Sequence, residues 1–358
     1  MARSKQASSP TFPTSTARRA ESACASFLAT RFGWDIPAEL VHLVPDVLAG
    51  LRITIKHFTP PGAAVIVPTP AYMPFLDVPA RAGREIIQVP SHVVDGRWAM
   101  DLDGIDRAFA AGAGLLVLCN PHNPLGQVMT SVEQSALSQV VERHGGRVFS
   151  DEIHAPIIYP GATHLPYAAL SDATARHTIT AIATSKGWNI PGLKTAQLIL
   201  TNDEDQATWH DRDLVPSQTG SILGAVAAAA AYLDGVDWLD SAVARFDANR
   251  HLLAGLLSRH TPEIGMRMPD ATYLAWLDFT SAGLKVAPAS FLLDAAGIAA
   301  SDGAACGTGG DGFVRFNFAL EAGMLEHAVV RMAHALQEPP SARAPTAHQH
   351  LPTRSRSH

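Results

Sequence analysis

A chain of 358 residues, 47% hydrophobic and 17% charged, is long enough for a large and a smaller folded domain, and its composition excludes a disordered or fibrous protein. The net charge of −6, with no basic stripe between the two ends, argues against a nucleic-acid partner. Three cysteines without a CxxC pair predict neither a disulfide framework nor a metal site, and no apolar run approaches the roughly 20 residues of a membrane span, so we expect a cytoplasmic protein with no membrane partner.

The two ends of the chain, residues 1–16 and 337–358, are rich in polar residues and proline and are predicted to be disordered tails. Between them, short apolar runs bounded by Gly and Pro predict strands buried on both faces of a parallel sheet. These runs are 64–67, 86–89, 115–119, 147–150, 179–183 and 196–200. Helices are predicted between several of them, at 47–57, at 221–233, and from the capping box at 130–133 to residue 143.

After a predicted long helix at 238–259 the pattern changes, with strands expected at 273–279 and 313–318 and helices at 288–295 and 321–336. The alternation of strands and helices predicts a doubly wound α/β domain over residues 17–240. The segment 241–336 is predicted to form a smaller α+β domain.

The segment Ala183-Thr184-Ser185-Lys186-Gly187 places a lysine directly after a predicted strand, and Lys194 follows eight positions later. One ammonium could form a Schiff base with an aldehyde, while the other and the hydroxyl groups could hold a phosphate. Taken alone, a surface loop with two solvated lysines is the commoner interpretation, because lysine is among the most exposed residues.

Two further segments follow predicted strands and carry polar side chains. Asp151 and His154 lie in SDEIH, and a carboxylate at the carboxyl end of a parallel strand could keep a pyridine nitrogen protonated. The alternatives are a helix N-cap for Asp151 and a hydrogen-bonded core histidine for His154. Asn123 lies in CNPHNPLG, where its amide could bind a ring oxygen, although such a segment is also typical of a turn.

An aromatic ring and an arginine complete the candidate site. Tyr72 could stack on a planar cofactor, or it could simply pack in the core. Arg315 stands between apolar residues in FVRFN, and its planar fork suits a carboxylate, with a structural salt bridge as the alternative.

In their order along the chain, NPHNP, SDEIH, SKGWNIPGLK, YLAWLD and FVRFN resemble segments of the fold type I pyridoxal 5′-phosphate (PLP) enzymes, the class I/II aminotransferase superfamily. Within it, the chain looks closest to the bacterial cystathionine β-lyases, the MalY/PatB-like C–S lyases. The resemblance covers roughly residues 12–337. It implies an α/β fold with a large domain built on a mixed, mostly parallel sheet, a smaller α+β C-terminal domain, PLP as cofactor, an amino-acid substrate and a homodimer.

The resemblance also implies a role for each matching residue. Lys186 would hold the cofactor and take the Cα proton, Asp151 would pair with the pyridine nitrogen, Asn123 would bind the ring oxygen with His154 nearby, and Tyr72 would stack on the ring. Four residues would cradle the phosphate, and these are Val47, Leu48, Ser185 and Lys194. Arg315 would bind the α-carboxylate of the substrate, with Trp188 and Tyr273 close by.

The implied activity is cleavage of a cysteine S-conjugate to thiol, pyruvate and ammonia. Transamination by the same residues is the alternative, and a truncated, non-catalytic PLP-binding paralogue is a further one. The last rests on three departures from the family pattern. The sequence lacks a counterpart to the family's N-terminal MWVADMDF-like stretch, Phe12 stands where the family has a tyrosine, and Asp46 stands where glycine is common, which would set a carboxylate beside the phosphate.

Overall fold

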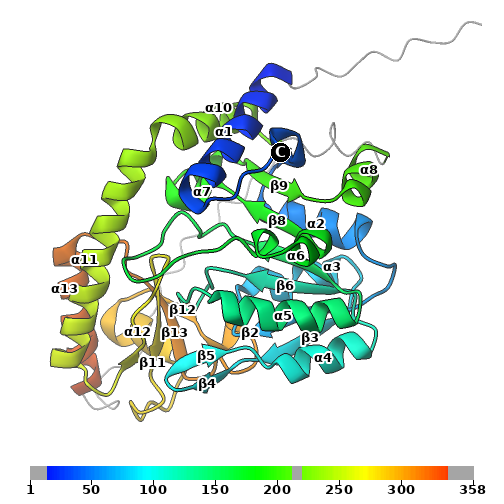
Figure 1. Cartoon of the computed structure of the whole chain (residues 1–358). Coiled ribbons are helices and arrows are strands. Elements are labelled where there is room, and N and C mark those ends of the chain that lie inside the picture. The colour runs from blue at the N-terminus through cyan, green and yellow to red at the C-terminus, as the bar shows by residue number, and fades with distance from the viewer. Residues whose placement is uncertain (1–13, 212–219, 338–358) are drawn as a thin grey trace, which may run out of the picture.

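The computed structural model describes residues 14–211 and 220–337, and a seven-stranded sheet is its centre (Figure 1). The strands lie in the order β1-β9-β8-β7-β6-β2-β3. Their bounds are β1 Val41–Val44, β2 Val65–Thr69, β3 Ile86–Pro90, β6 Leu115–Cys119, β7 Arg147–Asp151, β8 Thr178–Ile182 and β9 Ala196–Leu200. Strand β9 runs antiparallel to both neighbours, and the other pairs are parallel. The predicted mixed, mostly parallel sheet is therefore confirmed.

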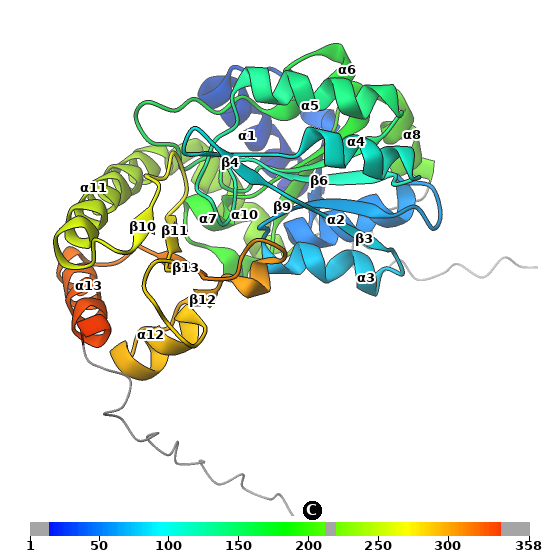
Figure 2. The same cartoon turned by 90° about the horizontal axis from the view of Figure 1, so that it is seen from below.

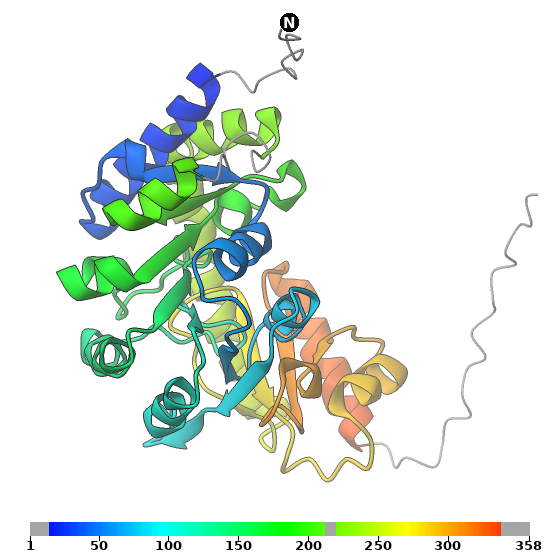
Figure 3. The same ribbon diagram turned by 90° about the vertical axis from the view of Figure 1, so that its right-hand side faces the viewer.

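Helices cover both faces of this sheet, as the view nearly along its strands shows (Figure 3). One face packs against α2 (Val47–His57), α3 (Val78–Arg81) and α8 (Asp203–Asp211). The other packs against α4 (Leu102–Ala110), α5 (Ser131–Arg143) and α6 (Asp172–His177), and, at the β1 end, against α1 (Thr14–Phe32) and α10 (Ile222–Asp234). Strands β1, β2, β6, β8 and β9 are buried at every position, which explains the nearly continuous hydrophobic runs in the sequence.

Helix boundaries follow local capping chemistry. Thr130 and Glu133 form the predicted capping box at the start of α5, with both reciprocal hydrogen bonds present. Asp46 and Ser221 cap α2 and α10 by accepting a hydrogen bond from the amide three residues later. These caps fix where two helices begin that border the site described below.

The C-terminal part of the chain forms a second, four-stranded sheet in the order β10-β11-β13-β12 (Figure 2). Its strands are β10 Gly265–Met266, β11 Leu274–Asp278, β12 Ser301–Asp302 and β13 Phe313–Asn317. The helices α11 (Val236–His260), α12 (Pro288–Ala296) and α13 (Ala322–Gln337) pack beside it. The α+β character predicted for this region is confirmed, and the pairing sets Arg315 opposite both Trp276 and Ser301.

The predicted tails need correction at their inner edges. Helix α1 already begins at Thr14, and α13 extends to Gln337, so residues 14–16 and 337 are helical rather than disordered. Residues 1–13 and 338–358, including Phe12, lie outside the described residues, as does the segment 212–219. Helix α11 passes unbroken through the predicted boundary at residues 240 and 241, and the division into two domains stays a prediction.

Several elements of the structure have no counterpart in the sequence predictions. They are the helices α1, α3, α4, α6 and α8, the strands β1, β10 and β12, the short hairpin of β4 (His92–Val94) and β5 (Arg97–Ala99), and the four-residue helix α7 (Thr184–Gly187). In the described ranges no single helix is long and apolar enough to cross a membrane, although α10 and α11 pass that test together with a bend of 78° between them. The same ranges contain no group of three or more His, Cys, Asp or Glu side chains placed to hold a metal ion.

Candidate active site

A cavity opens where β6, β7 and β8 end and α2 begins. It measures about 180 Å³ and adjoins a wider one of about 500 Å³ that reaches the second sheet. Tyr72, Asn123, His154 and Lys186 border both cavities. All ten site residues predicted from the sequence line one or both, although they come from segments as far apart as residues 47 and 315. The cavity also follows the general rule that ligands of open α/β sheets bind at the carboxyl ends of the strands.

Lys186 lies in α7, which begins two residues after β8 ends. Its side chain is partly buried and borders both cavities, so the interpretation as a solvated surface lysine is wrong. Burial lowers the pKa of its ammonium, and Arg315 adds to the effect, while the carboxylate of Asp151 opposes it. A lysine with a lowered pKa is a better nucleophile and base, because more of it is uncharged at neutral pH.

Asp151 is the last residue of β7 and only 4% exposed. Its Oδ1 accepts a hydrogen bond from the amide of Ile153 at 3.0 Å, and a turn rather than a helix follows, so the helix N-cap interpretation is wrong. Burial raises the pKa of this carboxyl to about 7, only partly offset by the Ile153 amide and Lys186. A cationic N–H group bound in the cavity would favour the ionised form of the Asp151 carboxyl.

His154 is 2% exposed, and its Nδ1 has no hydrogen-bond partner among the described residues. The interpretation as a fully hydrogen-bonded core histidine is therefore wrong for this nitrogen. The ring meets that of Tyr273 edge to face, with centroids 5.9 Å apart. Burial, together with the nearby charge of Lys186 and Arg315, lowers the pKa of His154 to about 3, so the imidazole is neutral at pH 7.

Arg315 connects the second sheet to the cavity. Its Nη1 donates to Oδ1 of Asn123 at 3.1 Å and its Nη2 donates to Oγ of Ser301 at 2.9 Å. Within the described ranges it forms no salt bridge, so the salt-bridge interpretation is wrong and its positive charge is left for a ligand. The guanidinium carbon lies 6.0 Å from the centre of the Tyr72 ring. Because Oδ1 of Asn123 is occupied by Arg315, the amide NH₂ of Asn123 is the part that can donate to a ligand.

Ser301 is the residue of this site that the sequence analysis missed. Strand β12 has only two residues, too few to show the alternation that marks a strand, and only its pairing with β13 places the hydroxyl beside Arg315.

The narrow end of the cavity lies at the N-terminus of α2. Val47 and Leu48 are its first two residues, whose amides have no partner within the helix. The carboxylate of Asp46 is directed to the Ala49 amide at 2.7 Å and to Nζ of Lys194 at 3.3 Å. The carboxylate that we expected beside a phosphate thus serves as the N-cap of α2 and as the ion-pair partner of Lys194.

Lys194 has the left-handed backbone conformation, with φ of 53°, and Ser185 borders the same end of the cavity. The segment that carries Lys194 is held close to α10 at Gly224, where a Cβ atom would lie 2.2 Å from the carbonyl oxygen of Leu193. Helix amides, a hydroxyl and an ammonium thus border this end of the cavity, a combination of groups that suits an anion.

The two aromatic residues expected near the site differ in role. Trp188 is buried in the core and its Nε1 donates to the Gly235 carbonyl at 2.8 Å, so it supports the fold. Tyr273 lines the wider cavity beside His154.

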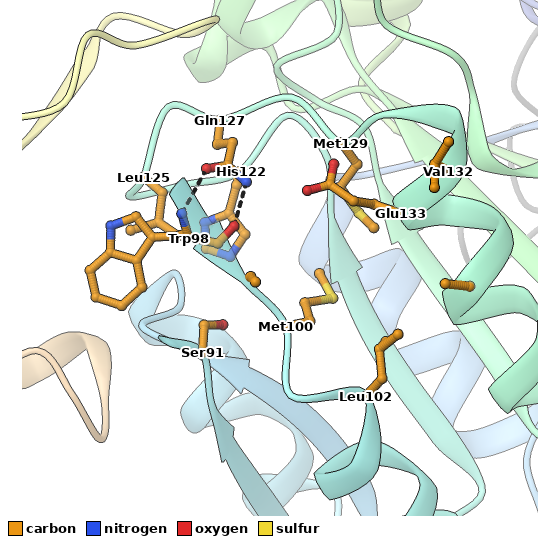
Figure 4. Close-up of a pocket in the computed structure, with 12 residues that line it drawn as sticks. Ser91, Trp98, Met100, Leu102, His122, Leu125, Gln127, Met129, Val132 and Glu133 are labelled. Carbon is orange, nitrogen blue, oxygen red and sulfur yellow. Dashed lines mark hydrogen bonds between the residues drawn. The ribbon is translucent and has the colours of Figure 1, made fainter. Parts of the chain in front are cut away.

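A separate, mostly apolar pocket of about 230 Å³ lies behind the 120–129 segment (Figure 4). Trp98, Met100, Leu125 and Met129 line it. Its carboxylate, Glu133, is used by the capping box and by Arg97. The buried imidazole of His122 lines this pocket, but none of the predicted site residues does, so the cavity around Lys186 is the candidate active site.

The polar groups around Lys186 suit a planar, nitrogen-containing ring that carries an anionic substituent. Comparison with known proteins points to the same kind of ligand. The family model described as aminotransferase class I and II matches residues 2–332. The chain belongs to the class I and II aminotransferase family. A cystathionine β-lyase from Corynebacterium glutamicum is 39% identical over 316 residues, which cover 88% of this chain and 83% of that protein. The cystathionine β-lyase PatB from Bacillus subtilis is 32% identical and covers 89% of this chain and 83% of its own.

Solved structures show that this family member shares the fold of PLP-dependent enzymes. A protein from Corynebacterium diphtheriae, described as a putative PLP-dependent β-cystathionase, superposes with a TM-score of 0.83 at 38% identity, covering 93% of this chain and 85% of that one. Cystalysin from Treponema denticola, which contains PLP, superposes with a TM-score of 0.85 at 28% identity, covering 92% and 84%. The fold type I PLP-dependent transferase fold predicted from the sequence is thus confirmed.

Proposed function

We propose that this member of the class I and II aminotransferase family is a PLP-dependent carbon–sulfur β-lyase that converts cysteine S-conjugates to thiol, pyruvate and ammonia. The observation that carries the proposal is the meeting of three groups in one cavity: a lysine with a lowered pKa, a buried carboxyl and an arginine without a carboxylate partner. The similarity to cystathionine β-lyases over most of the chain supports the lyase reaction.

The residues of the cavity fit PLP. The buried carboxyl of Asp151 gains an ionised form when it accepts a hydrogen bond from a pyridine N–H, and the NH₂ of Asn123 can donate to the ring oxygen. The buried Nδ1 of His154 lacks a protein partner in the described ranges, as expected of a group that faces a ligand. Tyr72 offers its ring face. The anion site of Val47, Leu48, Ser185 and Lys194 would hold the phosphate.

When bound, PLP supplies an electron sink that stabilises negative charge at the Cα atom of an amino acid. The protein contributes position and proton transfer. Arg315 holds the substrate carboxylate, with its guanidinium oriented in advance by Asn123 and Ser301. Lys186, uncharged once its ammonium has lost a proton, removes the Cα proton at Nζ. Asp151 keeps the proton on the pyridine nitrogen, without which the sink is weak.

In the elimination step the bond between Cβ and sulfur breaks and its electron pair leaves with the thiolate. The electrons left at Cα form the double bond to Cβ, and hydrolysis of the released unsaturated amine gives pyruvate and ammonia. Lys186 can return its proton to the departing sulfur, because the same amine faces the wider cavity.

The first prediction tests Lys186 directly. Lys186→Ala should abolish release of pyruvate and thiol from cystathionine or another cysteine S-conjugate, because one group both holds the cofactor and moves the proton. After borohydride reduction, mass spectrometry should find PLP attached to the peptide that contains Lys186 in the wild type. Lys194→Ala is the matched control, since it should weaken cofactor binding but keep that attachment. A wild-type protein that holds PLP but releases no thiol without a keto acid would exclude the lyase.

Transamination is the second candidate reaction, favoured by a relative of this chain described as a probable N-succinyldiaminopimelate aminotransferase, 32% identical over 46% of the chain. It would use the same residues, with the proton returned to the cofactor. Turnover that requires a keto acid and produces no thiol would establish it. Absence of turnover with either assay, in a protein that binds PLP, would establish the non-catalytic paralogue.

We further propose a homodimer in the cytoplasm. Ile222, Leu223 and Val226 expose apolar side chains at the start of α10, and Leu223 is 71% exposed. This end of α10 adjoins the anion site, because the Ser221 amide donates to the Lys194 carbonyl at 3.0 Å. A second copy covering this surface would also close the cofactor site. The three cysteines are free and buried, which fits a reducing compartment. Light scattering after gel filtration tests the dimer.

A further inference from the structure

Glu152 is a buried carboxylate directly next to Asp151. Its side chain is 1% exposed and, as expected of consecutive residues at a strand end, it is not among the residues that line the cavity. An ionised carboxylate in such surroundings is costly unless every lone pair finds a donor. The resemblance to known enzymes gave this residue no role.

Three donors meet at Glu152, one from its own strand end and two from the 164–167 segment. Oε1 accepts from Ser150 Oγ and from the Tyr167 amide, each at 2.9 Å. Oε2 lies 2.9 Å from Nε2 of His164, whose side chain is fully buried. Because a carboxylate can only accept, the proton in this pair is on Nε2 of His164. The pair therefore joins the end of β7 to the loop that carries His164 and to the 3₁₀ turn at Tyr167–Ala169.

The backbone of Glu152 continues this connection toward the cavity. Its amide donates to the Ala181 carbonyl at 2.8 Å, and its carbonyl accepts from the Ala155 amide at 2.9 Å. Asp151 precedes Glu152 and His154 follows it, so these two bonds fix the backbone of the 151–154 turn. The orientation of the Asp151 and His154 side chains depends on that turn. A shift of this turn would move both groups that face the ring.

We propose that Glu152 and His164 are positioning residues, which hold the 151–154 turn so that Asp151 meets the pyridine nitrogen and His154 meets the ring. The inference rests on the proposed PLP site. His164 supplies the charge-assisted donor that allows Glu152 to stay buried beside a second carboxyl group. Without that donor, Oε2 of Glu152 would be buried without a partner, and the side chain would take up water or move, which would displace the neighbouring Asp151.

The test uses the full-length apo protein and PLP labelled with ¹⁵N at the ring nitrogen. In the wild type, the ¹⁵N chemical shift should report a protonated ring nitrogen. In His164→Leu, the shift should move toward the unprotonated form, and the dissociation constant for PLP, measured by fluorescence titration, should rise about tenfold. His164→Gln, which keeps an N–H donor, should restore both values to near wild type. Ser150→Ala removes the hydroxyl donor of Glu152, and it should shift the ¹⁵N signal in the same direction by a smaller amount. This variant serves as the test if His164→Leu does not fold.

His177→Leu is the matched control. His177 is another buried histidine, and its Nε2 bonds the Tyr167 hydroxyl at 3.2 Å, so it supports the 3₁₀ turn at Tyr167–Ala169 rather than the 151–154 turn. It should lower the melting temperature but leave the ¹⁵N shift unchanged. An unchanged shift in both His164→Leu and Ser150→Ala would overturn the inference, as would equal effects of the two histidine variants. Failure of the wild type to bind PLP would instead overturn the proposed function.

Discussion

Two neutral oxygens, rather than a carboxylate, hold the guanidinium of Arg315 within the described residues. Asn123 reaches it from the large sheet and Ser301 from the small one. A guanidinium held in this way loses little freedom when a substrate carboxylate arrives, which is the physical basis of preorganised binding.

Ser301→Ala should therefore weaken substrate binding more than turnover. Loss of one hydrogen bond to a charged group is expected to raise KM for the amino acid roughly five- to tenfold, with kcat changed less than about twofold. Steady-state kinetics with a single cysteine S-conjugate checks this. Ser135→Ala on the exposed side of α5, where the hydroxyl bonds only the Ser131 carbonyl, should change neither constant. A fall in kcat with unchanged KM would show that Ser301 acts on the reaction itself.

At the scale of single residues, the sequence was informative where a side chain follows a recognisable strand. Lys186, Asp151 and Asn123 each lie just beyond an apolar run, so the edge of the sheet that they share could be predicted. Ser301 and His164 could not, because nothing in the local pattern shows that a hydroxyl will face Arg315 or that an imidazole will meet Glu152. Ser301 and Arg315 are 14 residues apart, and His164 and Glu152 are 12 residues apart. Only the folded structure defines how these segments lie relative to one another.

Helix α2 places its N-terminus at the narrow end of the cavity, and Asp46 is both its cap and the partner of Lys194. The two tasks have opposite consequences for cofactor binding. As a cap, Asp46 stabilises the helix whose free amides would bind the phosphate. Its negative charge, however, would repel the phosphate, and its ion pair with Lys194 competes with the phosphate for that ammonium.

Asp46→Asn separates these tasks, because asparagine is an equally good N-cap without the charge. We expect the dissociation constant for PLP to fall a few-fold and the melting temperature to stay within the error of the wild type. Asp46→Ala, which loses the cap, should cost about 1 kcal/mol of stability. Fluorescence titration of the apo proteins and thermal unfolding measure the two effects. Weaker PLP binding by Asp46→Asn would show that the carboxylate instead orients Lys194 for the phosphate.

At the scale of elements, apolar runs predicted six of the seven strands of the large sheet and the helices α2, α5, α10, α11, α12 and α13, whereas β1, α4 and α6 were not predicted. The hairpin of β4 and β5 was not predicted, because its three-residue strands are too short to show alternation of apolar and polar residues and β4 is exposed along its whole length. Helix α1 was not predicted, and its first residues were assigned to the N-terminal tail, because its first turn is polar and carries no acidic residue.

Across the whole molecule, burial keeps several histidines neutral. Four have a pKa lowered by burial to between about 3 and 4, and these are His42, His122, His154 and His177. Because the unfolded chain binds these protons at an ordinary pKa near 6.5, they stabilise the fold above that pH and the benefit is lost as pH falls. Glu21 and Asp151 act in the opposite sense, since burial raises the pKa of each carboxyl to about 7.

In the apo protein the four histidines outweigh the two carboxyls between about pH 4.5 and 6. Unfolding should then take up about two protons net, so that stability falls by about 3 kcal/mol per pH unit as the solution is acidified. Asp151→Asn removes one opposing group and should steepen the slope to about three protons. Urea titrations at several pH values give the slopes. A variant slope equal to that of the wild type would show that Asp151 is ionised in the apo protein.

Strand β1 pairs only with β9 in the described sheet, with Val41 opposite Ile199. During synthesis the ribosome therefore produces roughly 160 more residues before β1 has a partner, which takes about 8 to 30 seconds at ~5–20 residues per second. The parallel strands β2, β3, β6, β7 and β8 are all made in that interval. Strand β1 thus leaves the ribosome before the other six strands of this sheet but cannot pair until β9 has followed, and helix α2, which follows β1 directly, takes its place beside the cavity only when that edge of the sheet has closed.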